Sequence, residues 1–164
     1  MGDRVRYITA YFDGACAGQG TPDAAAGWSF VVEGDIEHEH FGRVEGMQDN
    51  NRAETCGLLE LLRWVDTQKG IVVDIVSDSV FVVEGIKTSG PRKAYADVWE
   101  DIRVLMERNR HSIRSVRWVP RDENDKADEL AKMAARCYLR LDREGYSLDF
   151  CLDTVISEIE VGQN

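Results

Sequence analysis

Tyr7-Ile8-Thr9-Ala10-Tyr11-Phe12-Asp13-Gly14 is the stretch that decides the fold, because this aromatic and β-branched run predicts a strand that ends on a carboxylate. An ionised acid at the end of so apolar a strand is expensive to bury unless hydrogen-bond donors or a cation compensate it. The segment from Gly14 to Gly20 is small and flexible enough to let a ligand approach the backbone closely. Taken alone, Asp13 is explained by the start of a turn; the acids that follow downstream change that interpretation.

Two further strands are expected directly after this one. Residues 27–33 predict the second strand, Gly34-Asp35 a two-residue turn, and residues 36–44 the third strand, so the first three strands would be antiparallel. His38 and His40 alternate along the third strand. We expect them to form an exposed pair rather than a metal site, because no third ligand lies nearby.

A second acid, Glu54, lies in the first turn of a predicted helix from Asn50 to about Thr67, whose apolar residues recur every three to four positions. A purely structural role is available to it. Asn51 and Glu54 have the spacing of a capping box, in which the Glu54 carboxylate only returns a hydrogen bond to the cap. Both interpretations stay open on the helix pattern alone.

The third acid, Asp78, ends a near-continuously apolar strand over residues 71–77 and precedes a short helix over about 80–86, which it could simply cap. If that strand is parallel to the first and adjacent to it, Asp13 and Asp78 meet at one sheet edge. Further elements are expected at about 94–109 (helix), 113–119 (strand) and 125–141 (helix). The fourth acid, Asp128, lies in the first turn of the last helix, where the helix dipole alone favours an anion by about 0.3 to 1 kcal/mol.

Bulk composition limits the possibilities. The 164 residues, 43% of them hydrophobic, predict one globular domain, and no apolar run reaches the ~20 residues of a membrane span. The start of the chain leads into the first strand without an apolar signal segment, so a cytoplasmic location is expected. The cysteines are scattered and predict neither a zinc site nor a disulfide framework. A net charge of −10 argues against a basic nucleic-acid-binding face but allows an acidic cleft neutralised by divalent metal.

The order of the expected elements, with acids at these four places, resembles the type 1 ribonuclease H family over about residues 7–139. The motifs that carry the resemblance are Tyr11-Phe12-Asp13-Gly14-Ala15, Asn50-Asn51-Arg52-Ala53-Glu54, Ser77-Asp78-Ser79 with Glu84-Gly85-Ile86, and Asn124-Asp125-Lys126-Ala127-Asp128-Glu129-Leu130-Ala131. Each motif is weak by itself, but the four in this order are specific. On this basis residues 1–141 form the ribonuclease H domain and residues 142–164 a C-terminal extension that packs back on the domain or docks on a partner.

The resemblance implies an α/β fold of the ribonuclease H type, a five-stranded mixed sheet with its first three strands antiparallel and helices on its faces. It also implies that Asp13, Glu54, Asp78 and Asp128 are catalytic and hold two Mg²⁺ ions, with Mn²⁺ as a substitute. Asp13 would bridge both ions, Glu54 and Asp78 would complete one site, and Asp128 would belong to the other. Oxygen-only ligands suit magnesium and disfavour zinc. Two such ions about 4 Å apart activate a water and steady the leaving oxygen of a phosphodiester.

The substrate implied is an RNA/DNA hybrid, whose RNA strand is cut to 5′-phosphate and 3′-hydroxyl ends. The 2′-hydroxyl distinguishes that strand, and the family's contacts to it map onto Gly14, Asn50, Asn51 and Ser79. No membrane and no obligate protein partner are indicated, and a monomer is expected. Two alternatives remain: a catalytically weak or silent hybrid-binding module, against which the four retained acids argue, and a DNA-directed nuclease of the same broad fold, against which the Asn-Asn-x-Ala-Glu helix start argues.

Three departures from the family pattern stand out. Family members often carry a histidine in the loop before the last helix; the segment Pro120–Asn124 has none, and Arg121 or Glu123 could partly fill its role. Asp49 stands where a threonine often helps to hold a DNA phosphate. The long basic protrusion of many bacterial members is reduced to the turn Lys87–Lys93. We therefore expect weak hybrid binding that depends on metal and falls with salt.

Overall fold

A computed structural model describes residues 4–88 and 93–145 of the chain. In chain order its elements are β1 (Arg6–Ala17), β2 (Ala25–Gly34), β3 (His38–Arg43), α1 (Asn50–Asp66), β4 (Ile71–Ser77), α2 (Val80–Lys87), α3 (Ala96–Arg108), β5 (Ile113–Trp118), the short 3-10 helix η1 (Arg121–Glu123) and α4 (Asp125–Glu144). Every strand and helix expected from the sequence is present, with boundaries that differ by a few residues.

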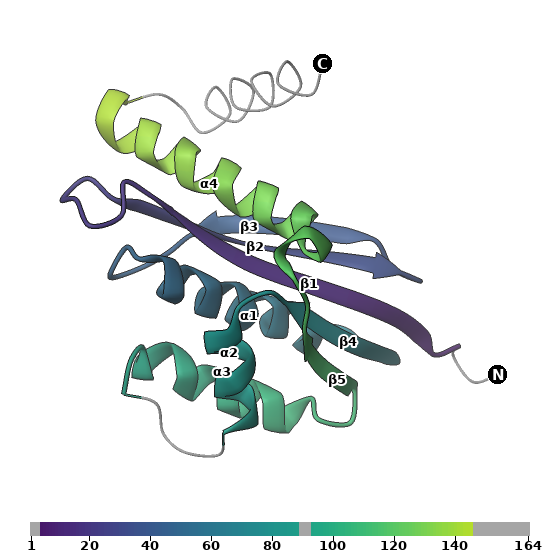
Figure 1. The fold of residues 1–164 in the computed structure, drawn as a ribbon. Helices are drawn as coiled ribbons and strands as arrows, with labels where there is room; N and C mark the ends of the chain where they lie inside the picture. The colour runs from purple at the N-terminus through teal and green to yellow at the C-terminus, as the bar shows by residue number, and fades with distance from the viewer. Residues whose placement is uncertain (1–3, 89–92, 146–164) are drawn as a thin grey trace.

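The five strands form one mixed sheet in the order β3-β2-β1-β4-β5 (Figure 1). The first three are antiparallel neighbours, as expected, whereas β4 runs parallel to both β1 and β5. β1 is therefore the central strand, and its apolar sequence reflects contacts on both faces and both edges. The predicted α/β class and sheet are confirmed.

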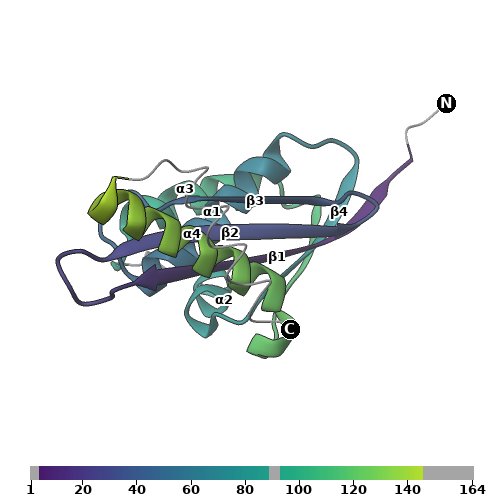
Figure 2. The same cartoon turned by 90° about the horizontal axis from the view of Figure 1, so that it is seen from above.

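Helices cover the two faces of the sheet. On one face the apolar stripe of α1 packs into the main core together with alternate residues of β1, namely Ile8, Ala10 and Phe12. On the other face α4 crosses β1 and β2, as the view from above shows (Figure 2). Gly27 makes this approach possible, because a Cβ there would lie 2.8 Å from the Cβ of Ala134. Ser29 Oγ donates to the carbonyl of Ala127 at 2.6 Å and fixes the start of α4 on the sheet.

The helix caps differ from the structural alternatives that the sequence offered for two of the acids. Asp49, not Asn51, caps α1, and its side chain accepts a hydrogen bond from the Arg52 N–H at 2.9 Å. The capping-box interpretation of Glu54 is therefore wrong. Ser79, not Asp78, caps α2 by accepting from the Val82 N–H at 3.2 Å. Both carboxylates are thus free of the capping role that would have explained them.

Several smaller expectations can be compared with the structure. His38 and His40 are exposed, as expected, and the His38 ring stacks on Trp64 with centroids 5.4 Å apart. α4 continues past Leu141 to Glu144, so the extension begins inside that helix; its remainder from residue 146 lies outside the described residues. The described cysteines, Cys16, Cys56 and Cys137, are free thiols. Over the described ranges, no helix combines the length and apolar character that crossing a bilayer requires.

Candidate active site

The position of Asp13 follows from how the sheet ends. β1 pairs with β4 as far as Tyr11 opposite Val76, and β4 ends one residue later at Ser77. Beyond that point β1 continues with β2 alone, so Asp13 lies where the parallel pairing stops and Asp78 begins the next segment. The side chain of Asp13 is only 2% exposed, and its Oδ1 accepts from the Gly14 N–H at 2.8 Å.

Gly14 explains how Glu54 comes to the same place. A Cβ at Gly14 would lie 2.1 Å from the carbonyl carbon of Ala53 and 2.2 Å from the backbone nitrogen of Glu54, distances that no side chain tolerates. The first turns of α1 therefore lie directly against β1 beside Asp13. Glycine is required here by close approach of two backbones rather than by an unusual dihedral angle.

Ser79 links Glu54 to the end of β4. Its Oγ donates to Glu54 Oε2 at 2.7 Å while accepting from the Val82 N–H. One buried hydroxyl thus caps α2 and orients the Glu54 carboxylate. The sequence indicated Ser79 as a substrate contact; in the structure its side chain is engaged with the second acid.

Asp78 is held by residues at the end of β5 and in the segment that follows it. Asn124 is 1% exposed, and its Nδ2 donates to Asp78 Oδ1 at 2.7 Å and to the carbonyl of Phe12 at 3.0 Å. Trp118 Nε1 donates to the backbone oxygen of Asp78 at 3.0 Å. Arg121 Nε lies 3.7 Å from Asp78 Oδ2, and the Arg121 side chain is 78% exposed. Asn124 therefore ties β1, Asp78 and the start of α4 together.

Sequence reasoning treated Asn124 only as part of a turn and of the last motif. The available signal was an amide placed directly before a helix and four residues before an acid. That signal does not reveal the burial of Asn124, because the hydrogen-bond partners of the Asn124 side chain come from distant elements.

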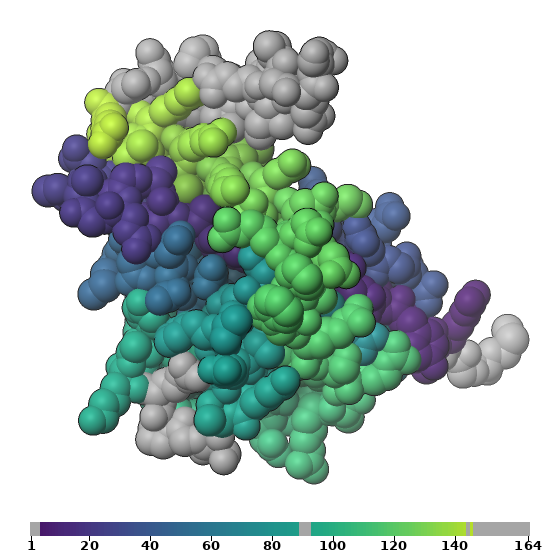
Figure 3. Space-filling view, viewed as in Figure 1, coloured from purple at the N-terminus to yellow at the C-terminus, as the bar shows by residue number. Residues whose placement is uncertain are grey.

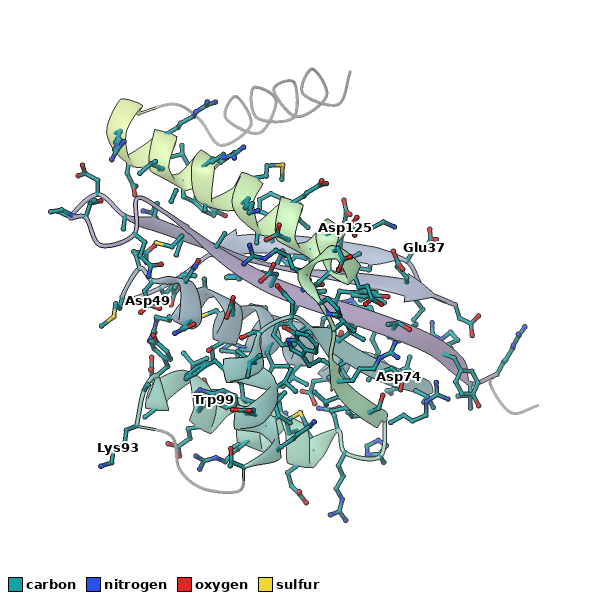
Figure 4. The ribbon with its side chains drawn as sticks, in the orientation of Figure 1. Glu37, Asp49, Asp74, Lys93, Trp99 and Asp125 are labelled. Carbon is teal, nitrogen blue, oxygen red and sulfur yellow. The ribbon has the colours of Figure 1, made fainter. Side chains whose placement is uncertain are left out.

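Asp128 joins the site from the first turn of α4, whose start lies over the sheet near the label of Asp125 (Figure 4). Its Oδ2 forms an ion pair with Lys132 Nζ at 2.8 Å, one turn further along the helix. Figure 3 shows this face of the molecule, with the teal surface of α2 next to the green surface around the start of α4. The four acids predicted from sequence thus come from β1, α1, the end of β4 and α4.

Electrostatic coupling shows that these acids share one region. Burial raises the pKa of Asp13 to about 9; the Asp78 carboxylate adds to this rise, the Gly14 N–H opposes it, and Glu54 and Asp128 raise the pKa further. Burial also raises the pKa of Glu54, the Ser79 hydroxyl lowers it, Asp78 and Asp128 raise it, and Arg121 lowers it. Asp78 and Asp128 therefore disfavour the charge on both Asp13 and Glu54, an arrangement typical of functional sites.

A divalent cation fits the chemistry of this donor set, since hard cations prefer carboxylate oxygens and would offset both the burial and the carboxylate repulsion that raise the pKa of Asp13. The side chains as they stand do not form a finished ligand set. Among residues 4–88 and 93–145, no three His, Cys, Asp or Glu side chains are grouped to hold a metal ion. Each acid is instead engaged by a protein donor: Gly14, Ser79, Asn124 or Lys132. Each carboxylate has further acceptor positions on its two oxygens, so these donors can stay in place while a cation binds.

The other predicted substrate residues lie at the N-terminal end of α1. Asn50 and Asn51 are both exposed there, and the backbone N–H of Asn50 donates to Gln19 Oε1 at 3.0 Å. Gly14 is buried between β1 and α1. An exposed pair of amides thus stands one helical turn before Glu54, which is the placement expected of groups that contact a ligand reaching the acids.

Comparison with known proteins bears on this geometry. The family model described as RNase H matches residues 5–136. Ribonuclease H of Nitrobacter hamburgensis is 31% identical over 146 residues, covering 77% of this chain and 89% of the relative. Ribonuclease H of Cupriavidus necator is 33% identical over 144 residues, covering 77% of this chain and 94% of the relative.

Solved structures are similar as well. RNase H1 of the halophilic archaeon Halobacterium salinarum is 30% identical, with a TM-score of 0.58 over 78% of this chain and 96% of its own. LC11-RNase H1 in complex with an RNA/DNA hybrid has a TM-score of 0.65 over 78% of this chain and 96% of its own. At 22% identity, the latter likeness supports the fold alone.

Proposed function

The chain belongs to the RNase H family and is a ribonuclease H enzyme, and on this premise we propose that Asp13, Glu54, Asp78 and Asp128 are its catalytic residues and that it hydrolyses the RNA strand of RNA/DNA hybrids. The single observation that carries the site assignment is that burial and the neighbouring carboxylates of Asp78, Glu54 and Asp128 all raise the pKa of the buried Asp13. A structural role does not require three carboxylates whose charges repel that of a buried fourth, because such an arrangement destabilises the fold.

The family depends on divalent metal in general, and we propose that the ion here is Mg²⁺, bound as a pair, with Mn²⁺ as a substitute. Asp13, Glu54, Asp78 and Asp128 would hold the two ions, which supply a nucleophilic water and stabilise the leaving oxygen when bound. The donors Ser79 and Asn124 keep the Glu54 and Asp78 carboxylates facing the site before any cation arrives. Pre-orientation of this kind lowers the cost of gathering the acids.

Arg121 is the cation that the sequence places where many relatives carry a loop histidine. Its guanidinium lies 3.7 Å from Asp78 and is largely exposed, so it can meet an anionic substrate at the edge of the site. A guanidinium stays protonated at any working pH and cannot relay a proton as imidazole does. We therefore propose that Arg121 attracts the phosphate backbone or the released 5′-phosphate rather than transferring protons.

Asn50 and Asn51 are proposed to contact the substrate together with the backbone at Gly14 and with Ser79. Amide side chains both donate and accept, which suits recognition of a 2′-hydroxyl. Since the Ser79 hydroxyl already bonds Glu54 and caps α2, its contribution to the substrate would come through Glu54 or the backbone. This arrangement supports selection of the RNA strand.

We further propose a monomeric cytoplasmic enzyme with its catalytic domain in residues 1–141 and an accessory extension from 142 onward. Free thiols at Cys16, Cys56 and Cys137 support a reducing compartment. The family match ends at residue 136, which supports the domain limit near the end of α4.

The experiment uses the full chain with end-labelled RNA/DNA hybrid, double-stranded RNA and duplex DNA, each with Mg²⁺ or Mn²⁺. Wild-type protein should cut the RNA of the hybrid, and Asp13→Asn and Asp78→Asn should abolish the cleavage while still binding hybrid. Asp74→Asn is the matched control. Asp74 lies within β4, before Ser77, whereas Asp78 follows Ser77, and the Asp74 carboxylate forms an ion pair with Arg114. If the wild-type protein binds hybrid without cleaving it, the chain is a silent binding module. If it cuts duplex DNA as well as it cuts hybrid, it is a DNA-directed nuclease.

A further inference from the structure

The N-terminus of α1 is tied to the N-terminus of α3 by a network that lies outside the four acids. Tyr95 Oη lies 2.9 Å from both oxygens of Asp49, the residue that caps α1. The backbone N–H of Arg52 donates to Asp49 Oδ1 at 2.9 Å. The Arg52 guanidinium is committed elsewhere, in a forked bond to Asp97 at 2.8 and 3.2 Å, so the phenol is the side-chain group that holds Asp49.

Tyr95 occupies an unusual conformation. Its φ of 58° is the one positive φ among the described non-glycine residues, and it places the residue in the left-handed region that a bulky side chain adopts at a cost. Its ring packs edge-on against Phe81, with centroids 6.0 Å apart. Burial, followed by the bond to Asp49, raises the pKa of Tyr95 to about 12, so the hydroxyl keeps its proton for donation at any working pH. The residue with the strained backbone is therefore the same residue whose hydroxyl bonds the Asp49 carboxylate.

Asp49 stands immediately before the exposed amides of Asn50 and Asn51. Figure 4 shows Asp49 at the start of α1, on the same side of the molecule as Lys93, which shortly precedes α3. An Asp49 carboxylate that was free to turn outward would repel the phosphates of a nucleic acid lying across the first turn of α1, because charges of the same sign repel one another. The phenol instead holds both carboxylate oxygens toward α3.

Resting on the proposed function, we propose that Tyr95 is a positioning residue of the substrate site: its hydroxyl holds the Asp49 carboxylate against α3 and so keeps the first turn of α1 open to the phosphate backbone of the hybrid. Tyr95 acts through Asp49 and touches neither the acids nor the reacting atoms. The cap of α1 and access to its exposed amides are thereby controlled by one hydroxyl from a different helix.

The test compares Tyr95→Phe with the double variant Tyr95→Phe/Asp49→Asn in full-length protein. Loss of the hydroxyl should raise the KM for hybrid about three- to tenfold and change kcat by less than about twofold, with a larger effect at low salt. The second substitution should restore KM, because asparagine caps a helix as well as aspartate but carries no charge. Tyr7→Phe is the control, since Tyr7 is an exposed tyrosine near the start of β1, whereas Asp13 lies towards the other end of that strand.

Thermal unfolding of every variant separates positioning from stability. An unchanged KM in Tyr95→Phe would overturn the proposal, and so would a raised KM that Asp49→Asn fails to restore, because a structural role would leave the charge of Asp49 irrelevant. Failure of the proposed function is recognised separately: in that case wild-type protein itself leaves the hybrid uncut.

Discussion

Replacing Asp13 by asparagine in metal-free protein should raise the free energy of unfolding, and by more at higher pH. The pKa of Asp13 lies at about 9 in the fold against an ordinary value of 3.8. Between these values the folded protein holds a proton that the unfolded chain has released, so the contribution of Asp13 is fully present below pH 3.8 and is lost as pH rises toward 9. Asparagine mimics the protonated carboxyl at every pH.

The magnitude follows from proton linkage. One proton of difference changes the free energy of unfolding by about 1.4 kcal/mol per pH unit. Across two pH units, from about 5.5 to about 7.5, the advantage of Asp13→Asn over wild type should therefore grow by about 2.7 kcal/mol. Such a difference shifts the melting temperature of a chain this size by roughly 5 to 11 °C.

Urea unfolding followed by circular dichroism in EDTA, at several pH values in this window, measures the effect. Asp74→Asn is the control, because Arg114 lowers the pKa of Asp74, and its contribution is lost only as pH falls below the ordinary range. Parallel pH dependences for wild type and Asp13→Asn would refute the reasoning, since the carboxyl would then titrate alike in both states. Added Mg²⁺ should stabilise wild type near neutral pH and leave Asp13→Asn much less affected.

Three further outcomes are expected. Gly14→Ala should destabilise the fold by roughly 3 kcal/mol or more in urea unfolding, because its Cβ would lie 2.1 Å from the Ala53 carbonyl carbon; a mild loss would show that α1 can move away from β1. Arg121→Ala should lower kcat/KM for hybrid about tenfold and Arg121→Lys should recover part of it, whereas equal activity of all three would exclude a role for this cation. Asn124→Leu should remove the donor to Asp78, reduce activity and lower the free energy of unfolding by about 1 to 3 kcal/mol. Unfolding curves that match those of the wild type would show that the Asn124–Asp78 hydrogen bond is dispensable.

The sheet and its helices could be predicted from the sequence because their signals are local. The apolar run of β1, the near-continuous run of β4 and the three-to-four spacing in α1 each determine an element without reference to the rest of the chain. The convergence of Asp13 and Asp78 followed from the expectation of parallel neighbouring strands, and the register of β1 with β4 agrees with it.

Features that depend on contacts between distant segments were less accessible. The sequence suggested that Asn51 and Glu54 form a capping box, yet Asp49 is the N-cap of α1. The Asp49 carboxylate also accepts a hydrogen bond from Tyr95, 46 residues away in the chain. Asn124 gave no sign of burial, since its partners Phe12 and Asp78 come from other parts of the chain. The placement of Arg121 beside Asp78 likewise depends on the 3-10 turn of η1, which its sequence does not specify.

The arrangement of donors around the acids explains why the site can exist before a cation binds. Four neighbouring carboxylates would repel one another unless each had a partner, and Gly14, Ser79, Asn124 and Lys132 provide one partner each. Two of these donors, Ser79 and Asn124, also cap a helix or anchor a strand, so they hold their acids in place without a cation. Lys132 lies on an exposed helix face and holds Asp128 by an ion pair alone. Asp128 should therefore be the acid that turns most readily, and an Asp128 variant should weaken metal binding less than an Asp13 variant does.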